Sequence, residues 1–226
     1  MSPPGSRAWT PGERLVGRVA SWDGDDRGPA SDAPVVGVLA LQGDVLEHLR
    51  ALHRCGAQAI RVRTPADLAR VHGLVVPGGE STTIGRLLER FGLMGPVRGR
   101  IVAGLPTFGT CAGMIVLSRE LDQEFDQPRL ATLGVRTRRN AFGRQVSSFD
   151  VSLDVKGIDG GPMDVAFIRA PWVTQVLDDD VDVWAEVDGH PVVVAQRAML
   201  ATSFHPEITG DDRLHAWFVE QVRAAA

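Results

Sequence analysis

Short apolar runs alternate with amphipathic stretches along the first half of the chain. VVGVLAL at 35–41 is a continuous apolar run of the kind that a strand buried on both faces requires. AIRVR and GLVVP follow as two further runs, and residues 43–55 and 81–91 place apolar side chains at helical spacing. This alternation over residues 34–120 predicts parallel strands joined by helical crossovers, as in an open doubly wound sheet.

From about Thr132 the pattern changes to shorter strands in which apolar and polar residues alternate. VDVWAEV at 181–187 alternates strictly, and the Asp-Gly pair that follows predicts a tight hairpin into the next strand. The apolar stretch VVVAQRAMLATSF at 192–204 is expected to be the strand that leads to His205. We expect this half of the sheet to be antiparallel or mixed.

The two ends of the chain differ in character. Residues 211–224 predict a final amphipathic helix that packs on the sheet through Leu214, Trp217, Phe218 and Val222. The first 33 residues are rich in Pro, Gly, Asp and Arg, which favours a disordered extension with at most a short strand around Leu15–Val19. They lack a signal-peptide core, and no later run reaches the ~18 apolar residues of a membrane span. We therefore expect an extension at 1–33, one domain at 34–226, and neither export nor membrane anchoring.

The composition of the 226 residues excludes several kinds of protein. Hydrophobic residues make up 44% and charged residues 23%, as in ordinary globular chains. A formal net charge of -4 argues against a broad surface for nucleic acid or anionic lipid, so small molecules or proteins are the expected partners. The two cysteines, Cys55 and Cys111, lie far apart, and no Cys/His pair has zinc-site spacing. We expect no metal site and a cytoplasmic location.

The stretch LPTFGTCAGMIVLSREL carries the clearest chemistry. It predicts a short strand, an abrupt turn at Gly109–Gly113 and a helix that starts at the cysteine, which is the nucleophile elbow G-x-S-x-G with Cys in place of Ser. Glycines let the backbone approach closely at such a bend, and the N–H groups of a helix start favour a thiolate. A buried cysteine is often only structural, and Cys55, late in an amphipathic stretch, is interpreted that way. We predict that Cys111 is a nucleophile.

A thiolate nucleophile needs an oriented proton carrier, and His205 and Glu207 have suitable spacing. In an extended segment these side chains project to the same side, and Pro206 stiffens the link between them. Glu207 can then accept from one ring nitrogen of His205 while the other faces Cys111. H-P-E alone is a weak motif, but here it ends an apolar strand of the sheet that carries the cysteine. The other five histidines are expected on the surface or in the core: His48, His53, His72, His190 and His215.

Together, GTCAG and a distant HPE resemble the pattern of class I (triad) glutamine amidotransferases. LALQGDVLEHL, VVPGGESTTIGRLL, RRNAFGRQVSSFD and VAFIRAP are similar to segments of the glutaminase subunits of pyridoxal 5′-phosphate synthase, the PdxT family. The resemblance runs from about Val35 to Val222, and GGEST and RNAFGRQ are specific within the superfamily. It implies an α/β, flavodoxin-like class I glutamine amidotransferase domain, three-layered, with a central mixed, largely parallel sheet.

The resemblance also implies an activity and roles for single residues. The activity is hydrolysis of L-glutamine to L-glutamate and ammonia without a cofactor, with Cys111 as nucleophile, His205 as general acid/base and Glu207 as its orienting partner. The backbone N–H groups of Gly43 and Ala112 would form the oxyanion hole. The implied glutamine-binding positions are Gly78, Gly79, Glu80, Arg139, Ile168 and Arg169.

Several of these positions also have a simpler structural interpretation. Gly43 is equally well explained as a plain strand-to-helix glycine. GGES is also a helix-leading turn with Ser81 as N-cap, a role compatible with ligand binding. On charge alone Arg139 does not differ from its neighbours Arg136, Arg138 and Arg144, and only the motif distinguishes it.

The implied partner is a synthase subunit, a (β/α)8 barrel that combines ammonia with two sugar phosphates in a hetero-oligomer. Docking is expected to activate the glutaminase through a rearrangement around Gln42 and Gly43. Three alternatives remain: the glutaminase of imidazole glycerol phosphate synthase, a DJ-1-like cysteine-elbow protein, and a binding subunit without activity. GGEST and RNAFGRQ argue against the first alternative, and the HPE pair and two arginines against the second. The intact set of Cys111, His205 and Glu207 argues against the third.

Overall fold

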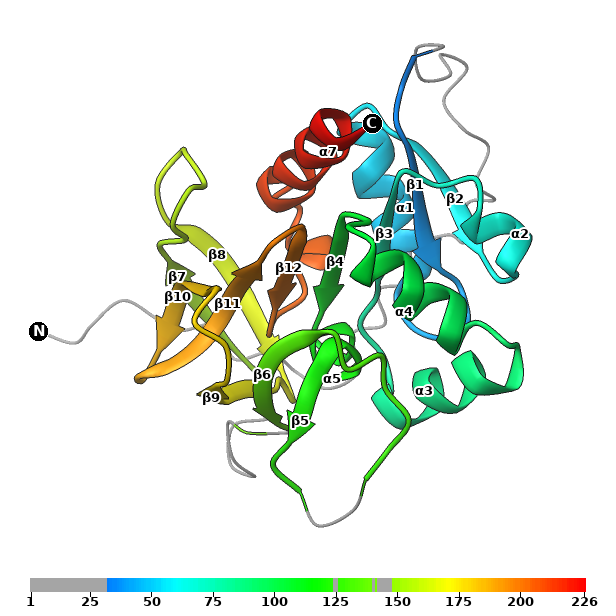
Figure 1. The fold of residues 1–226 in the computed structure, drawn as a ribbon. Helices are drawn as coiled ribbons and strands as arrows, with labels where there is room; N and C mark the ends of the chain where they lie inside the picture. Colours follow the sequence, from blue (N-terminus) through cyan, green and yellow to red (C-terminus); the bar gives the residue numbers. More distant parts are fainter. Residues whose placement is uncertain (1–31, 124–125, 140, 142–147) are drawn as a thin grey trace, which may run out of the picture.

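A computed structural model of the chain describes residues 32–123, 126–139, 141 and 148–226, and it is built on a central seven-stranded sheet (Figure 1). The order across the sheet is β10-β11-β12-β4-β3-β1-β2. Its strands are β1 (Val35–Leu39), β2 (Gln58–Val62), β3 (Gly73–Val76), β4 (Thr107–Thr110), β10 (Val181–Val187), β11 (His190–Gln196) and β12 (Met199–Thr202). Neighbours from β2 to β12 are parallel, whereas β10 and β11 add an antiparallel ribbon. The predicted mixed, largely parallel sheet is confirmed.

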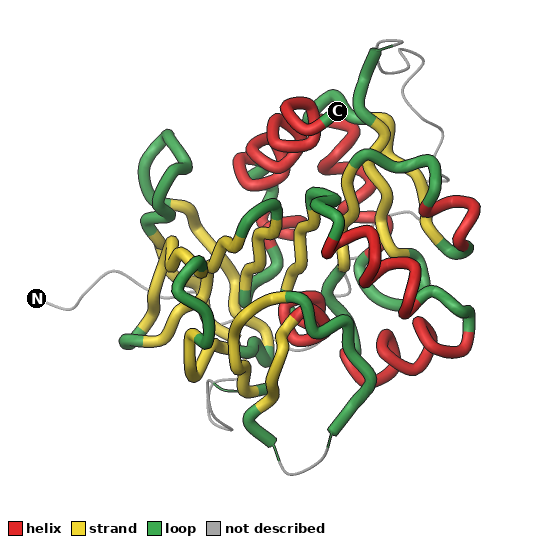
Figure 2. Tube along the Cα trace, viewed as in Figure 1, coloured by secondary structure: helices red, strands yellow, loops and turns green. Residues whose placement is uncertain are grey.

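Helices cover both faces of the parallel part of the sheet (Figures 1 and 2). They are α1 (Val45–Arg54), α2 (Pro65–Leu68), α3 (Ser81–Arg90), α4 (Met94–Val102), α5 (Ala112–Leu117), α6 (Pro206–Thr209) and α7 (Arg213–Ala225). Apolar side chains of α1 and α7 form one buried cluster with the sheet, and those of α3, α4 and α5 form a second. Within β3, Val75 belongs to the first cluster and Val76 to the second. The central strands are therefore buried on both faces, which is why their sequences are continuously apolar.

Two small sheets accompany the second half of the chain. One has the order β5-β6-β9, with β5 (Ser118–Leu121), β6 (Leu133–Arg138) and β9 (Trp172–Val176), and the other pairs β7 (Ser148–Leu153) with β8 (Met163–Ile168). The expectation that the helix after the cysteine includes SREL was wrong. The helix ends at Leu117, and the hydroxyl of Ser118 donates to the carbonyl of Met114 at 2.7 Å as the chain enters β5.

The expectation of one strand over VVVAQRAMLATSF was also wrong. The stretch forms β11 and β12, which pair antiparallel with Gln196 opposite Met199. Arg197 in the turn has φ 54°, a conformation that favours glycine. The reversal places β12 beside β4 in parallel register, so that both strands end at the same edge of the sheet.

The carboxyl edge of the sheet gathers four segments that are distant in sequence. The order β2-β1-β3-β4, continued by β12, is that of flavodoxin-like sheets, which bind ligands beyond the carboxyl ends of their strands. Residues 41–44 follow β1, residues 77–80 follow β3, Cys111 follows β4 and residues 203–207 follow β12. The predicted catalytic and binding motifs therefore meet at one edge.

Some predictions fall outside the described residues. These are residues 1–31 of the expected extension with its strand at Leu15–Val19, and most of RNAFGRQ, including Arg144. In the part of the chain that the structure describes, no helix has the length and apolar character needed to cross a membrane.

Candidate active site

Cys111 occupies a strained bend between β4 and α5. Its backbone has φ 47° and ψ -103°, and non-glycine residues with positive φ are uncommon and concentrate at functional sites. The Cys111 N–H donates to the carbonyl of Thr202 at 2.8 Å, which holds the bend against β12. A Cβ atom on Gly113 would lie 2.0 Å from the carbonyl oxygen of Val76, so only glycine fits there. The predicted strand, bend and helix are confirmed, although the strand continues through Gly109 and the bend lies at the cysteine itself.

His205 and Glu207 are buried together directly after β12. Nδ1 of His205 lies 2.8 Å from Oε1 of Glu207, and the two residues are 8% and 6% exposed. The expected extended segment was wrong, because α6 begins at Pro206, the first-turn position that proline favours. The short helix still directs the Glu207 carboxylate back to the ring of His205.

The ring of His205 contacts three groups that stabilise its charged form. Burial alone lowers the pKa of His205, but hydrogen bonds with Asp44, Cys111 and Glu207 outweigh burial and raise that pKa to about 12. Asp44 Oδ2 lies 3.4 Å from the same Nδ1 that faces Glu207, and the hydrogen bond to His205 lowers the pKa of Asp44. These contacts favour the protonated ring, and because Nδ1 faces the two carboxylates, Nε2 is the ring nitrogen left for Cys111.

A cavity of about 500 Å³ opens over Cys111, within the range of small-molecule sites. It is lined by Gln42, Asp44, Gly79, Glu80, Ser81, Cys111, Ala112, Ile115, Arg139, Ile168, Arg169, His205 and Ile208. Among the remaining predicted site residues, Gly78 and Glu207 contact His205 from outside the cavity lining. Gly43 lies between two lining residues with φ 109°, and a Cβ atom there would be 1.8 Å from the carbonyl oxygen of Gly78.

The GGES turn is held by the carboxylate of Glu80. The expectation that Ser81 caps the helix was wrong, since Glu80 is the N-cap and accepts from the N–H groups of Thr82 and Thr83 at 3.2 and 2.7 Å. Burial alone would raise the pKa of Glu80, but these bonds, the Thr83 hydroxyl and the charge of Arg139 lower it to about 2. The N–H of Glu80 donates to Oε1 of Gln42 at 2.7 Å, which joins this turn to the segment after β1.

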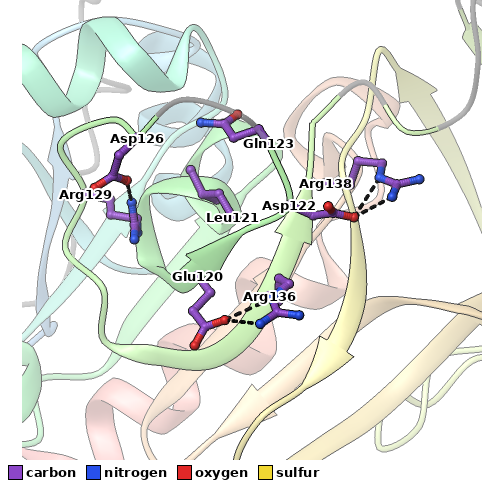
Figure 3. A pocket seen from close by; sticks show the side chains of 8 residues that line it. All are labelled: Glu120, Leu121, Asp122, Gln123, Asp126, Arg129, Arg136 and Arg138. Carbon is purple, nitrogen blue, oxygen red and sulfur yellow. Dashed lines mark hydrogen bonds and ion pairs between the residues drawn. The ribbon is translucent and has the colours of Figure 1, made fainter.

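Arg139 lines a different cavity from its neighbours Arg136 and Arg138. It donates to Oε1 of Glu80 at 2.8 Å and to the hydroxyl of Thr82 at 3.0 Å, at the wall of the cavity over Cys111. Arg136 and Arg138 instead line a different, larger cavity of about 730 Å³, where Figure 3 shows them paired with acidic side chains of the neighbouring segment. None of the described residues that line this larger cavity is a cysteine, serine or histidine, so its size does not mark it as the site that contains Cys111 and His205.

The sequence profile of the SNO glutamine amidotransferase family matches residues 38–224. The chain belongs to this family. It is 57% identical over 193 residues to the pyridoxal 5′-phosphate synthase subunit PdxT of Frankia alni, with 85% of this chain and 96% of the relative covered. The PdxT subunit of Mycobacteroides abscessus is 56% identical, with 85% and 99% covered. The resemblance predicted from the motifs is confirmed.

Solved structures agree with this assignment. A crystal structure of a glutamine amidotransferase superposes with a TM-score of 0.79 at 48% identity and covers 83% of this chain and 98% of its own. PurLQS of Thermotoga maritima, at 16% identity, has a TM-score of 0.58 over 85% of this chain and 98% of its own, and shares the fold alone.

Two residues that contact the predicted catalytic pair of this glutamine amidotransferase were not predicted from the sequence. Asp44 contacts His205, and His48, expected only as a surface or core histidine, lies 3.5 Å from Oε2 of Glu207 through its Nε2. The i, i+4 spacing of these residues in GDVLEH puts them on one face at the start of α1, and that spacing was the available signal.

Cys55, the second cysteine of this glutamine amidotransferase, lies away from the cavity over Cys111. Burial raises the pKa of the Cys55 thiol to about 11, and its Sγ donates to the carbonyl of Asp212 at 3.8 Å, as expected for a structural cysteine.

Asp44, His205 and Glu207 offer atoms within 4.8 Å of one another, a spacing that can hold a metal ion. An ion there would occupy the atoms through which His205 contacts Asp44 and Glu207.

Proposed function

We propose that this chain is the glutaminase subunit of a pyridoxal 5′-phosphate synthase, which hydrolyses L-glutamine to L-glutamate and ammonia. The observation that carries the proposal is the meeting of Cys111, at its strained bend, with a buried His205 that is 2.8 Å from Glu207, at the wall of an amino-acid-sized cavity. The names of the relatives, PdxT subunits at 56–57% identity, select the vitamin pathway over imidazole glycerol phosphate synthase.

Catalysis would begin with a thiolate on Cys111 paired with protonated His205. Sγ attacks the carboxamide carbon of glutamine, and a C–S bond forms as the carbonyl becomes an oxyanion. Protonated His205 then gives its proton to the departing nitrogen, the C–N bond breaks and ammonia leaves. Glu207 keeps the ring in position and stabilises its charged form throughout.

The remaining predicted residues bind the substrate and the oxyanion. Arg139 and Glu80 are proposed to hold the α-carboxylate and α-amino group of glutamine, with Gly78, Gly79, Ile168 and Arg169 shaping the binding site. The N–H groups of Ala112 and Gly43 would donate to the oxyanion, where one positioned donor contributes ~2.7–4 kcal/mol. The position of Ala112 in the cavity wall supports its role.

The second half of the reaction releases glutamate. Neutral His205 takes a proton from a water molecule, whose oxygen attacks the γ-glutamyl thioester on Cys111. The C–S bond then breaks and the thiolate is restored with a protonated ring. No cofactor is needed for either step.

Ammonia must reach a second active site before water protonates and dilutes it. We propose that the acceptor is a (β/α)8-barrel synthase subunit that docks over the cavity mouth and rearranges the segment around Gln42 and Gly43. Two isoleucines of the cavity lining support a docking surface there, because Ile168 is 41% and Ile208 is 47% exposed. We propose a cytoplasmic location for the assembly.

The test is glutamine-dependent ammonia release by this chain with and without the barrel subunit. The proposal predicts strong release only in the mixture, and none when Cys111→Ala replaces the wild type. A chain that hydrolyses glutamine equally fast alone would refute the docking step. Undiminished release by Cys111→Ala in the mixture would leave a binding subunit without activity as the better explanation.

A further inference from the structure

Two fully buried histidines lie behind the catalytic pair. His48 from α1 and His215 from α7 are each 0% exposed. Nε2 of His48 is 3.1 Å from the hydroxyl of Thr110 and 3.5 Å from Oε2 of Glu207, while its Nδ1 is 2.9 Å from Nε2 of His215. A continuous row of polar groups therefore runs from α7 to the catalytic carboxylate.

The second carboxylate oxygen of Glu207 depends on this row. Oε1 is 2.8 Å from Nδ1 of His205, but Oε2 is buried and has no hydrogen-bond partner of normal length among the described residues. A buried carboxylate oxygen without a donor costs substantial free energy, so a facing N–H strongly affects where the carboxylate settles. Nε2 of His48 is the ring nitrogen that faces it.

The ring nitrogen of His48 that carries the proton decides how these contacts are made. Burial lowers the pKa of His48 well below 6.5 and that of His215 to about 4, so both rings are neutral at pH 7 and carry one N–H each. A proton on Nδ1 of His48 would point a lone pair at the Glu207 carboxylate. It would also leave His215 with an unpaired Nδ1–H in the core, because that atom has no partner in the described structure.

A proton on Nε2 of His48 removes both problems. This N–H lies between the Thr110 hydroxyl and the Glu207 carboxylate, and His215 donates its Nε2–H to Nδ1 of His48. Of the four ring nitrogens of this histidine pair, only an acceptor, Nδ1 of His215, is then unpaired among the described residues, and buried unpaired acceptors are less rare than buried unpaired N–H groups. The other charged or titratable groups that act on the two rings are His205, Asp212 and Arg54.

We propose that His48 is a positioning residue for the triad. Its Nε2–H holds Oε2 of Glu207, and His215 selects the tautomer of His48 that carries this proton. A carboxylate held at both oxygens cannot rotate away from His205, so the ring stays directed at Cys111. The ring of Phe108 packs against both histidines, at centroid distances of 6.5 and 5.6 Å, and limits their movement. The inference extends the proposed function, because it concerns the same site.

Two substitutions of His48 distinguish the effect of its N–H donor from the effect of its side-chain volume. His48→Leu removes the donor, whereas His48→Gln keeps an amide N–H at about the reach of Nε2. In the complex with the synthase subunit we expect His48→Leu to lower kcat for glutamine about tenfold or more, with KM within about twofold, by analogy with outer-shell partners of catalytic ligands. We expect His48→Gln to retain kcat within about threefold of wild type.

A second readout does not depend on glutaminase activity. The rate at which iodoacetamide alkylates Cys111 is followed against pH by peptide mass spectrometry, with Cys55 as internal reference. His48→Leu is expected to slow alkylation of Cys111 at pH 7 about fivefold or more, because a loosened His205 stabilises the thiolate less. His48→Gln should keep the wild-type profile. If the wild-type protein is alkylated at Cys111 but never hydrolyses glutamine, the proposed function is wrong. The comparison of alkylation rates still tests the role of His48 in that case.

The proposal is overturned if His48→Leu matches wild type in both readouts, or if His48→Gln loses as much as His48→Leu. Should His48→Leu fail to fold, His215→Phe replaces it. This change keeps a ring in the core but removes the N–H that selects the tautomer. We then expect a measurable decrease in kcat for glutamine and in the alkylation rate of Cys111. An unchanged alkylation rate would overturn the proposal that His215 and His48 position Glu207.

Discussion

A Cβ atom on Gly78 would lie 2.3 Å from Cε1 and 2.7 Å from Nδ1 of His205, so the ring of His205 rests directly against this glycine. The contact joins the turn after β3 to the segment after β12, which meet only because both strands end at the same edge of the sheet. The absence of a side chain at position 78 thus defines where the ring can lie.

Gly78→Ala is expected to displace His205 from Glu207 and Cys111. The new methyl group cannot fit at these distances, so the ring must move, and loss of proton-transfer geometry commonly costs ~10²-fold. We expect kcat for glutamine hydrolysis to fall about tenfold or more. Gly95→Ala on α4 is the matched control, because a Cβ atom there meets nothing within 4 Å. Equal activities of the two variants would show that the ring does not depend on Gly78.

Arg139 and Arg138 provide a comparison between adjacent residues of one type. Arg139 faces the cavity over Cys111, whereas Arg138 pairs with Asp122 at 2.5 Å outside it. Arg139→Gln is expected to raise KM for glutamine roughly 10- to 100-fold, because a hydrogen bond to a charged group contributes ~1.5–3 kcal/mol. Arg138→Gln should leave KM within about twofold of wild type. Steady-state kinetics in the assembled complex measures both, and a larger effect at Arg138 would reverse the assignment.

Much of the parallel half of the fold could be predicted because its physical demands are local. Strands such as β3 are buried on both faces and so are continuously apolar, and their helices show one apolar face. The hairpin between β11 and β12 could not be predicted, because Arg197 adopts the left-handed conformation in a turn that contains no Gly, Asn, Asp or Pro. Tertiary pairing with β4 outweighs that local preference.

The candidate site was predicted where a motif is contiguous and missed where it depends on packing. The bend at Cys111 and the HPE pair are encoded within a few residues. The i, i+4 spacing of Asp44 and His48 indicates that both lie on one face at the start of α1, but the contact of His48 with Glu207 exists only once α1 packs beside α6. Ser81 was expected as the helix cap because serine favours that position, but the longer Glu80 side chain reaches the same N–H groups.

The buried histidine pair predicts a loss of stability on mild acidification. The folded pKa of His215 is lowered to about 4 by burial, against 6.5 for an exposed histidine. Between these values the unfolded chain binds a proton that the folded chain does not, so the free energy of unfolding decreases as pH falls from 6.5 toward 4, by roughly 3 kcal/mol for this residue. His205 does not contribute in this window, because its raised pKa keeps it protonated in the folded state and an unfolded histidine is largely protonated there too.

Urea unfolding between pH 7.5 and 4.5 checks this prediction. His215→Phe removes the titrating group and should flatten the dependence of unfolding free energy on pH relative to wild type. Because the comparison uses the difference between two curves, carboxylates that titrate in the same range cancel to first order. Parallel curves for the two proteins would contradict the assignment of a neutral, buried His215.

The covalent intermediate offers the most direct test of the glutaminase proposal. The complex is quenched with acid during glutamine turnover, and its peptides are analysed by mass spectrometry. The account predicts a γ-glutamyl group on the peptide that contains Cys111, none on that with Cys55, and none at either position in Cys111→Ala. Steady turnover with no acyl group on Cys111, or turnover that survives Cys111→Ala, would contradict it.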